Sequence, residues 1–462
     1  MLCENIVSDI LSAAVSGGAG FAEVFEEKTV KDSLSLINGK TDSALSGVEA
    51  GVGIRIIEGE KVVYVYTNKT DRESLLKLAQ NGAQMLKGIN KPGAYSFDKT
   101  DYSLKTLYPA EILPSEVKKE EIAAILKTGS DTAFKYDKRI TQTSFSYLAS
   151  TQNVLIANTE GLWATDERTR TRVFINAVAS DEREKQNGYF GPGAMKGFEF
   201  LRNLDIVGLS NEAARVAVTM LTAGACPSGR FPVIIDNGFG GVIFHEACGH
   251  GLEAAAVSKG ASVFAGKIGK QIANPKVSAY DDGTIVNAWG SVNVDDEGHP
   301  SQKNLLIENG ILKGYMVDRF NGARMGAAAT GSSRRQSYKF MPVSRMTNTY
   351  IAPGTDSRDD IIASTKFGIY AKYMGGGSVN PASGEFNFAV NEGYIIRDGK
   401  ICEPVRGATL IGKGSQVLTD IDMVSSDLKL AEGMCGASSG SIPVCVGQPM
   451  IRVKEITVGG RG

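Results

Sequence analysis

The chain has 462 residues, of which 42% are hydrophobic and 22% are charged, and its formal net charge is -1. This is the composition of an ordinary globular protein with room for two or three domains. The balanced charge argues against a nucleic-acid footprint or a polybasic membrane patch, and no apolar run is long enough to cross a bilayer. The acidic beginning, MLCENIVSDI, is unlike a secretory signal. We therefore expect a cytoplasmic protein that binds neither nucleic acid nor membrane.

Helical and strand patterns alternate along the first half of the chain. Apolar periodicity predicts helices at 4–18, 71–86, 114–134 and 211–224. Strand patterns, separated by turn signals such as NGK and EGEK, occur at 20–30, 33–39, 52–59, 61–68, 142–150, 153–158 and 162–180. The charged, Gly-rich segment 181–197 is expected to be a mobile loop or a hairpin tip. This order predicts an N-terminal α+β domain over residues 1–225, with helices packed on a sheet.

The second half, residues 226–462, is predicted to be a β-rich domain. It begins with a turn and a strand at 226–236, followed by a helical pattern over 238–257. Short strands and hairpins follow at 283–294, 304–317, 391–404 and 451–458, where ENG and RDG are typical hairpin turns. The Gly-rich segments 325–337 and 373–385 are expected to be long loops. The predicted fold class is α+β, with a helix-on-sheet domain followed by a β-rich C-terminal domain.

Two of the three histidines in the chain lie in the stretch FHEACGHGLE, with a glutamate after the first. The zinc-peptidase motif HExxH has two residues between its histidines, whereas three separate His245 from His250. On a regular helix, residues five apart point about 140° away from each other. A shared metal ion therefore requires a π-bulge or a break in the helix, which Gly249 and Gly251 would tolerate. The alternative is a structural helix that merely contains two histidines.

Glu246 follows the first histidine of this motif. If His245 binds zinc, Glu246 lies beside the open position of the metal and can pass a proton from the bound water to the leaving amine. A catalytic zinc needs a third protein ligand. The sequence leaves four candidates: His299, Glu253, Cys248 and a distant cysteine, among which Cys435 stands out in the Gly/Ser-rich stretch EGMCGASSGS.

Other polar residues have a plainer interpretation. The aspartates lack the spacing of an EF-hand, so turn chemistry is favoured for Asp281, Asp282, Asp295 and Asp296. Cys445 lies in the apolar stretch IPVCVG and is expected in the core. For Arg334 and Arg335, the sequence supports two interpretations equally, a solvated loop or a contact with a peptide carboxylate or carbonyl.

Several stretches of the second half resemble, in order, the TldD/PmbA family, also called modulators of DNA gyrase, and within it the catalytic TldD branch. They are HEACGHGLE, ASVFAGKIG, DDGT, GSVNVDDEG, LIENGILKGYM, SRMTNTYIAPG, YMGGG, GATLIGKG and GMCG. The resemblance implies a Zn²⁺ site formed by His245, His250 and Cys435, with Glu246 as the general base on a zinc-bound water. It implies no ligand role for His299.

The resemblance also implies an activity, a substrate and a partner. The expected protein is a zinc-dependent metallopeptidase that hydrolyses unfolded or leader peptides, held as an added β-strand in a closed chamber between subunits. A dimer is implied, either a homodimer or a heterodimer with a sister subunit that lacks the zinc motif. Two alternatives are a non-catalytic partner subunit of such a complex and a zinc amidase that acts on small molecules.

Overall fold

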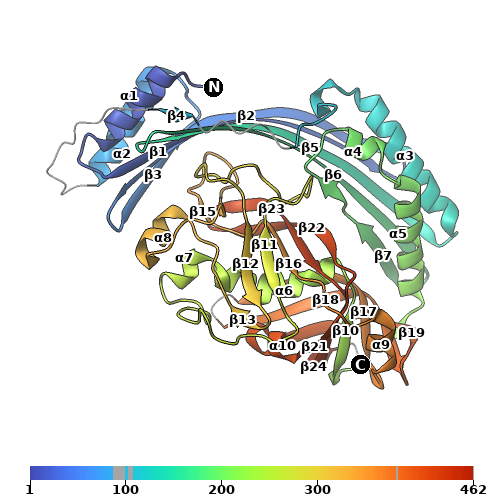
Figure 1. Ribbon diagram of the computed structural model, residues 1–462. Helices are drawn as coiled ribbons and strands as arrows, with labels where there is room; N and C mark the ends of the chain where they lie inside the picture. Colours follow the sequence, from blue (N-terminus) through green and yellow to red (C-terminus); the bar gives the residue numbers. More distant parts are fainter. Residues whose placement is uncertain (87–98, 102–107, 381–382, 461–462) are drawn as a thin grey trace.

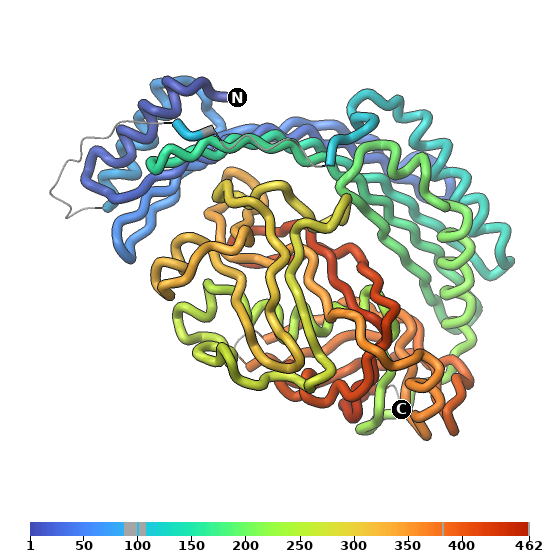
Figure 2. Tube along the Cα trace, in the orientation of Figure 1, coloured from blue at the N-terminus to red at the C-terminus, as the bar shows by residue number. Residues whose placement is uncertain are grey.

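A computed structural model describes residues 1–86, 99–101, 108–380 and 383–460. The first half of the chain forms a long curved sheet that arches over the β-rich second half (Figures 1 and 2). Among the described residues, no helix combines the length and apolar character needed to span a bilayer. The α+β class predicted from the sequence, with a β-rich C-terminal part, is confirmed.

The curved sheet is built from four strands of 17 to 19 residues and several shorter ones. Its order is β3-β2-β1-β5-β6-β4, and both β7 and β8 pair with β6. The strands are β1 (Phe21–Ile37), β2 (Lys40–Glu58), β3 (Lys61–Thr67), β4 (Thr100–Asp101), β5 (Ile140–Asn158), β6 (Leu162–Ser180), β7 (Lys185–Phe190) and β8 (Gly193–Ala194). Side chains alternate between the two faces of this sheet, and its concave face points to the second half of the chain (Figure 1).

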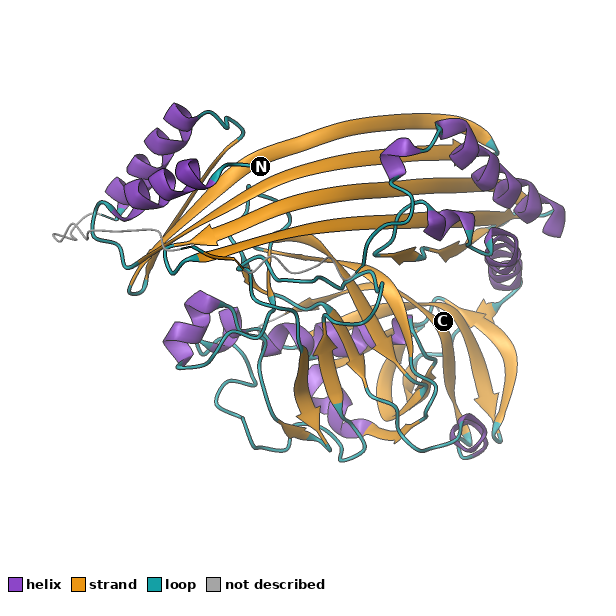
Figure 3. Ribbon diagram, turned by 45° about the horizontal axis from the view of Figure 1, so that its top comes forward, coloured by secondary structure: helices purple, strands orange, loops and turns teal. Residues whose placement is uncertain are grey.

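Helices cover the convex face at both ends of the sheet (Figure 3). At one end α1 (Glu4–Val15) and α2 (Arg72–Met85) bury an apolar cluster against β1 and β2. At the other end α3 (Lys119–Tyr136) and α5 (Ile206–Leu221) pack on β5 and β6, with the short helix α4 (Glu199–Arg202) beside them. The C-terminal half lies on the opposite, concave face (Figure 1).

Two predictions for this region can be compared with the structure. Of the two forms expected for the segment 181–197, it takes the hairpin and not the mobile loop, because β7 pairs with β6. Gly188 of this segment allows α5 to pack closely, since a Cβ at Gly188 would lie 2.0 Å from the backbone oxygen of Ala213 in α5. The helix predicted from residue 211 begins at Ile206, because the Asp205 carboxylate caps it by accepting a hydrogen bond from Gly208 N at 2.8 Å.

The C-terminal half contains two larger sheets. One has the order β17-β10-β24-β20-β18-β19-β9, with β21 paired to β24, and the other has the order β13-β12-β11-β16-β23-β22. The strands are β9 (Gly224–Ala225), β10 (Gly229–Ile235), β11 (Ala279–Asp282), β12 (Lys303–Glu308), β13 (Ile311–Leu312), β14 (Ser333–Arg334), β15 (Val343–Ser344), β16 (Asn348–Ile351), β17 (Phe367–Asn380), β18 (Glu385–Arg397), β19 (Lys400–Arg406), β20 (Thr409–Lys413), β21 (Ile421–Val424), β22 (Lys429–Ala437), β23 (Gly440–Gln448) and β24 (Ile451–Gly459).

Short helices connect these strands, and one lies between the two sheets. They are η2 (Phe239–Gly241), α6 (Val242–Ala247), η3 (Gly249–Leu252), α7 (Ala254–Val257), α8 (Arg319–Met325), α9 (Arg358–Ala363) and α10 (Gly414–Asp420), and η1 (Pro114–Glu116) precedes α3 in the first half. Phe244 of α6 shares one buried cluster with Ile369 of β17 and Val446 of β23. The central core of this half therefore surrounds the helix that carries the histidine motif.

The predicted hairpins 304–317 and 391–404 are confirmed, since Asn309 and Asp398 begin their turns with positive φ. The predicted strand 283–294 is wrong. Ser291 donates a side-chain hydrogen bond to Ile285 O at 2.6 Å, which closes this segment into turns.

The loop predicted over 373–385 is also wrong for its described part, because β17 continues to Asn380 and β18 begins at Glu385. Residues 381 and 382 lie outside the described residues. The glycines of this hairpin permit close packing, as a Cβ at Gly377 would lie 2.0 Å from the backbone oxygen of Asn387.

Buried ion pairs join the curved sheet to the C-terminal half. Arg55 of β2 contacts Glu297 at 2.6 Å, and Arg168 of β6 contacts Asp296 at 2.6 Å. Arg335 reaches Glu23 of β1 at 2.7 Å, so the solvated loop weighed for it is excluded. With these charges paired across the contact, the two halves are held in register by directional bonds as well as by apolar packing.

Candidate metal centre

The helix that carries the histidines breaks where the spacing of the motif predicts. Helix α6 ends at Ala247, and Cys248 leaves helical geometry with φ -129° and ψ -48°. A 3₁₀ turn, η3, then carries His250. Gly249 allows close packing at the break, because a Cβ there would lie 2.2 Å from Met346 Sδ. The break predicted within the helical pattern over 238–257 is therefore confirmed.

The break brings both histidines to one cysteine. His245 Nε2 lies 3.3 Å from Cys435 Sγ, and His250 Nε2 lies 3.4 Å from the same sulfur. One donor atom from each of the three residues lies within 4.8 Å of the others, and no other such group of three occurs in the described chain. His245 and Cys435 are buried, and His250 is nearly so. The structure thus assembles the three residues named by the resemblance from segments that are 185 residues or more apart.

The donor geometry fits zinc. A tetrahedral zinc has bonds of about 2.0–2.1 Å to nitrogen and about 2.3 Å to sulfur, which places the two ligand atoms about 3.5 Å apart. Both nitrogen–sulfur distances at the site are close to this value. Two imidazoles and a thiolate are also a donor set that zinc prefers over calcium or magnesium. Three protein ligands leave a fourth position for a substrate or water.

A layer of polar groups holds these side chains in place. Glu253 Oε1 lies 3.2 Å from His250 Nδ1, on the side of the ring away from Cys435. Arg345, which is fully buried, donates to the backbone oxygen of Cys435 at 2.6 Å and to Ser439 Oγ at 2.8 Å. Second contacts of this kind fix the orientation of ligands. The sequence offered no periodic signal for Arg345, and only the contact with Cys435 shows its place.

Glu246 completes the polar side of the centre. Its Oε2 lies 3.6 Å from His250 Nε2, and its side chain is about 25% exposed. Burial raises the pKa of Glu246, and the opposing effect of His250 is smaller. Burial also lowers the pKa of His245 well below its ordinary value, and His250 and Arg345 add to the effect. A neutral imidazole is the form of histidine that binds a metal.

The other candidate ligands lie elsewhere or have other contacts. Cys248 is buried in the apolar core around α6, where burial strongly raises the pKa of its thiol. His299 lies in a turn, where its backbone N donates to Asp295 Oδ1 at 2.9 Å. The same carboxylate accepts from Glu297 N at 2.9 Å, which agrees with the turn chemistry expected of Asp295. Asp296 and Asp281 instead bind the distant residues Arg168 and Thr347, so turn chemistry is wrong for these two. Cys445 is buried in strand β23, as expected.

Three family models match the chain in order. They describe a PmbA/TldA metallopeptidase domain 1 at residues 22–86, a central domain at 112–221 and a C-terminal domain at 228–460. A "Metalloprotease TldD homolog" from Haemophilus influenzae is 39% identical over 455 residues, which cover 95% of this chain and 93% of the relative.

The chain belongs to the PmbA/TldD family of metallopeptidases. A second relative of this PmbA/TldD chain, a "Zinc metalloprotease TldD homolog" from Saccharolobus solfataricus, is 34% identical over 253 residues, or 54% of this chain and 56% of the relative. The names of these relatives support a metal ion as cofactor.

Solved structures share the PmbA/TldD fold over the whole chain. A putative modulator of DNA gyrase from Thermotoga maritima aligns with a TM-score of 0.81 and 22% identity, covering 99% of this chain and 100% of the other. TldE from Thermococcus kodakarensis aligns with a TM-score of 0.75 and 19% identity, covering 98% of this chain and 100% of the other. At these identities the alignments show the common fold.

Proposed function

We propose that this PmbA/TldD chain is a zinc-dependent peptidase whose zinc is held by His245, His250 and Cys435. The observation that carries the proposal is the convergence of two imidazole nitrogens on one buried thiol at distances that suit a tetrahedral zinc. Zinc bound there acts as a Lewis acid that polarises a carbonyl oxygen and makes water more acidic. The names of the relatives agree with this assignment.

Glu246 is the proposed general base. Its carboxylate lies beside the ligand His250 and remains partly open to solvent, so a water molecule can approach both Glu246 and the centre. One carboxylate oxygen accepts a proton from this water, and the same oxygen later returns the proton to the leaving amine. Glu253 holds the Nδ1 side of His250, which keeps the Nε2 atom directed at Cys435.

The proposed substrate is an extended peptide that adds to strand β22. This strand is the last one of its sheet in the described chain, and it contains Cys435. Cys445 N and Ser441 N bond to Thr347 O and Gln336 Oε1, which lie on the side of β23 away from β22.

These two bonds show that Cys445 and Ser441 turn their backbone N–H groups away from β22. Cys445 and Ser441 are opposite Glu432 and Gly436, so both form non-hydrogen-bonded pairs. By the same alternation Met434 and Gly436 turn their backbone N–H and C=O groups toward the open edge, on either side of Cys435. A peptide paired there would lie beside the metal centre through main-chain hydrogen bonds, with weak sequence selection.

Unfolded or leader peptides are the proposed substrates, since a folded protein cannot offer a free strand to this edge. We also propose that the active form is a dimer in which a second subunit closes the chamber. That subunit is either another copy or a sister chain without the histidine motif. The fold shared with TldE supports the second possibility.

Metal analysis combined with a peptidase assay tests this proposal. Purified Glu246→Gln should keep its zinc and lose hydrolysis of an unstructured peptide by about 10²- to 10⁴-fold. Cys435→Ser should lose zinc, whereas Cys248→Ser, the matched control on a buried thiol outside the centre, should keep it. Unchanged hydrolysis by Glu246→Gln would favour a non-catalytic subunit, and hydrolysis of small amides but not of peptides would favour an amidase.

A further inference from the structure

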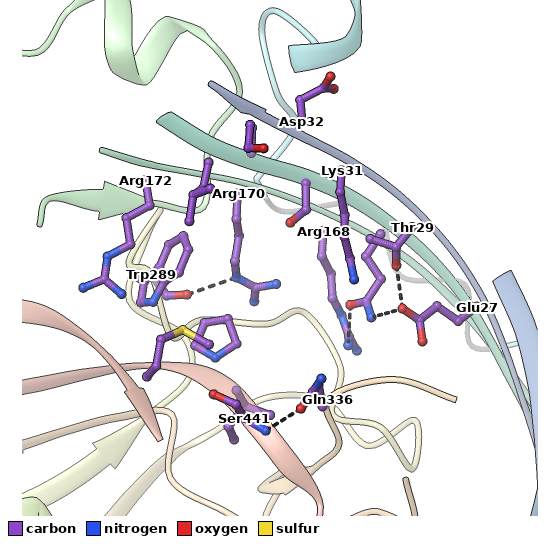
Figure 4. Close-up of a pocket in the computed structure, with 18 of the residues that line it drawn as sticks. Glu27, Thr29, Lys31, Asp32, Arg168, Arg170, Arg172, Trp289, Gln336 and Ser441 are labelled. Atoms are coloured by element: carbon purple, nitrogen blue, oxygen red, sulfur yellow. Dashed lines mark hydrogen bonds between the residues drawn. The ribbon is translucent and has the colours of Figure 1, made fainter. Parts of the chain in front are cut away.

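A cavity of about 730 Å³ lies between the concave face of the curved sheet and the C-terminal half (Figure 4). Arg168, Arg170 and Arg172 occupy alternate positions of β6, so all three point to this face. Their side chains are more than nine-tenths buried. Figure 4 shows them in a row above the cavity, with Trp289 beside them. Three arginines on one buried face are costly unless negative charge balances them.

This cavity is separate from the metal centre. Met434 lines it, whereas the next residue, Cys435, points to the other face of β22 because side chains alternate along a strand. Met434 is 51% exposed and Cys435 is only 4% exposed, as this opposite orientation requires. A ligand in the cavity therefore occupies a different space from a ligand of the proposed zinc.

The positive charge of the cavity is not fully balanced within the chain. Arg168 forms ion pairs with Asp166 and Asp296. In contrast, Arg170, Arg172 and the facing Arg334 form no ion pair among the described residues. Their hydrogen bonds go to backbone oxygens of Trp289, Ser291, Gly191, Glu432 and Met346.

The carboxylates that line the cavity are engaged elsewhere. Asp32 binds Lys119, and Glu27 accepts hydrogen bonds from Gln152 and Tyr338 N. Asp296 is the partner of Arg168. None of the three forms an ion pair with Arg170, Arg172 or Arg334.

Arg170 is also repelled by neighbouring arginines. Burial lowers the pKa of Arg170 to about 9, and the neighbouring Arg334 and Arg168 add to this effect. The hydrogen bonds of Arg170 and Arg172 use Nε and Nη2 of each guanidinium, so the Nη1 groups keep their donors. Free guanidinium donors on adjacent arginines suit a carboxylate oxygen pair.

The walls of the cavity combine this charge with apolar surface. The Arg172 guanidinium lies 4.8 Å from the ring centre of Phe174 and 5.3 Å from that of Trp289. The residue opposite Arg170 on the neighbouring strand is the small Ser150, and the residue opposite Arg172 is Leu148. Leu148 is 42% exposed, which places it at the solvent side of the cavity. An ordered anion with an apolar body could contact both kinds of wall.

We propose that this cavity binds an organic carboxylate with an apolar or aromatic body. The carboxylate lies between Arg170 and Arg172, and the body packs on Trp289 and Leu148. This site is distinct from the proposed zinc site, because it requires neither the zinc ligands nor Glu246. It adjoins the edge proposed for the peptide, since Met434 belongs to both.

Two variants at Ser150, similar in size but different in charge, test the proposed carboxylate site. The probe is N-acetylphenylalanine, measured by calorimetry on the intact protein, with N-acetylphenylalaninamide as the uncharged control. Ser150→Asp places a carboxylate opposite Arg170 and should weaken binding at least about tenfold, since bonds to charged groups are strong. Ser150→Asn, which has nearly the same size, should change the affinity less than about threefold. The amide should bind at least about tenfold more weakly than the acid in wild-type protein.

Further variants distinguish binding in the cavity from binding at the metal centre. Binding should persist in Cys435→Ser, so loss of binding there together with full binding in Ser150→Asp would move the probe to the metal centre and overturn the proposal. Equal affinity for inorganic phosphate, equal affinity for the amide, or no binding at all would overturn it too. If Ser150→Asp does not fold, Leu148→Glu and Leu148→Gln, opposite Arg172, provide the same comparison at an exposed position.

Discussion

Replacing Arg345 by methionine should weaken zinc binding, although its guanidinium bonds to none of the three donor atoms. The side chain is fully buried, and it donates to the backbone oxygens of Cys435 and Gly440 and to Ser439 Oγ. These bonds hold the turn that follows Cys435 against the helix break. Methionine has a similar length but no donors, so the thiol would lose its fixed position.

The expected loss in zinc affinity is about 10- to 100-fold, as for other residues that orient a ligand. This corresponds to about 1.4 to 2.7 kcal/mol. The value is reasonable for the single bond from Arg345 to the oxygen of Cys435, because a hydrogen bond from a charged donor contributes about 1.5–3 kcal/mol. The other two bonds should lower the free energy of unfolding instead when they are lost.

The assay is competition for zinc with a chelator of known affinity, followed by mass spectrometry of the bound metal. Arg452→Met is the matched control, since Arg452 forms an ion pair with Asp422 and contacts no residue of the metal centre. Circular dichroism would establish that both variants fold. A folded Arg345→Met protein with wild-type zinc affinity would refute the role assigned to Arg345.

Three further outcomes follow from the centre. Gly249→Ala should lower the free energy of unfolding by about 1–3 kcal/mol in urea, because its Cβ would collide with Met346; an unchanged midpoint would contradict the close packing at the helix break. Glu253→Ala should reduce zinc affinity at least about tenfold by releasing His250, while Glu253→Gln, which keeps an acceptor, should lose less. Chelation should lower the melting temperature of the wild type but leave that of Cys435→Ser unaltered, since only a bound metal adds stability; equal shifts in both proteins would place the metal elsewhere.

The local part of the centre was predictable from the sequence. If His245 and His250 share a metal ion, their spacing requires an interruption near Gly249, because helix geometry fixes where side chains point. The third donor depends on how distant segments pack, and residue chemistry left several candidates. The Gly/Ser-rich context favoured Cys435 among the distant cysteines, and only the resemblance set it above Cys248, Glu253 and His299. The assignment of these residues as ligands stays a prediction, as does the domain division between residues 225 and 226.

The sequence did not reveal which side chains are buried where the two halves of the chain meet. The alternating arginines of β6 are typical of the solvent side of a strand, whereas the C-terminal half covers that face. Gly-rich composition predicts a loop or hairpin tip around Gly188 and a loop around Gly377, but both glycines permit close contacts inside paired strands. Contacts of this kind depend on how the folded strands and helices pack, so a local sequence pattern cannot predict them.

The separation between the histidines and Cys435 has a consequence for a newly made chain. The ribosome adds about 5–20 residues per second, so the 185 residues from His250 to Cys435 take roughly 10 to 40 seconds to synthesise. During that time the two imidazoles have no thiol partner. A growing chain is itself an unfolded polypeptide, and this order of synthesis keeps the three donors apart until nearly the whole described fold has emerged.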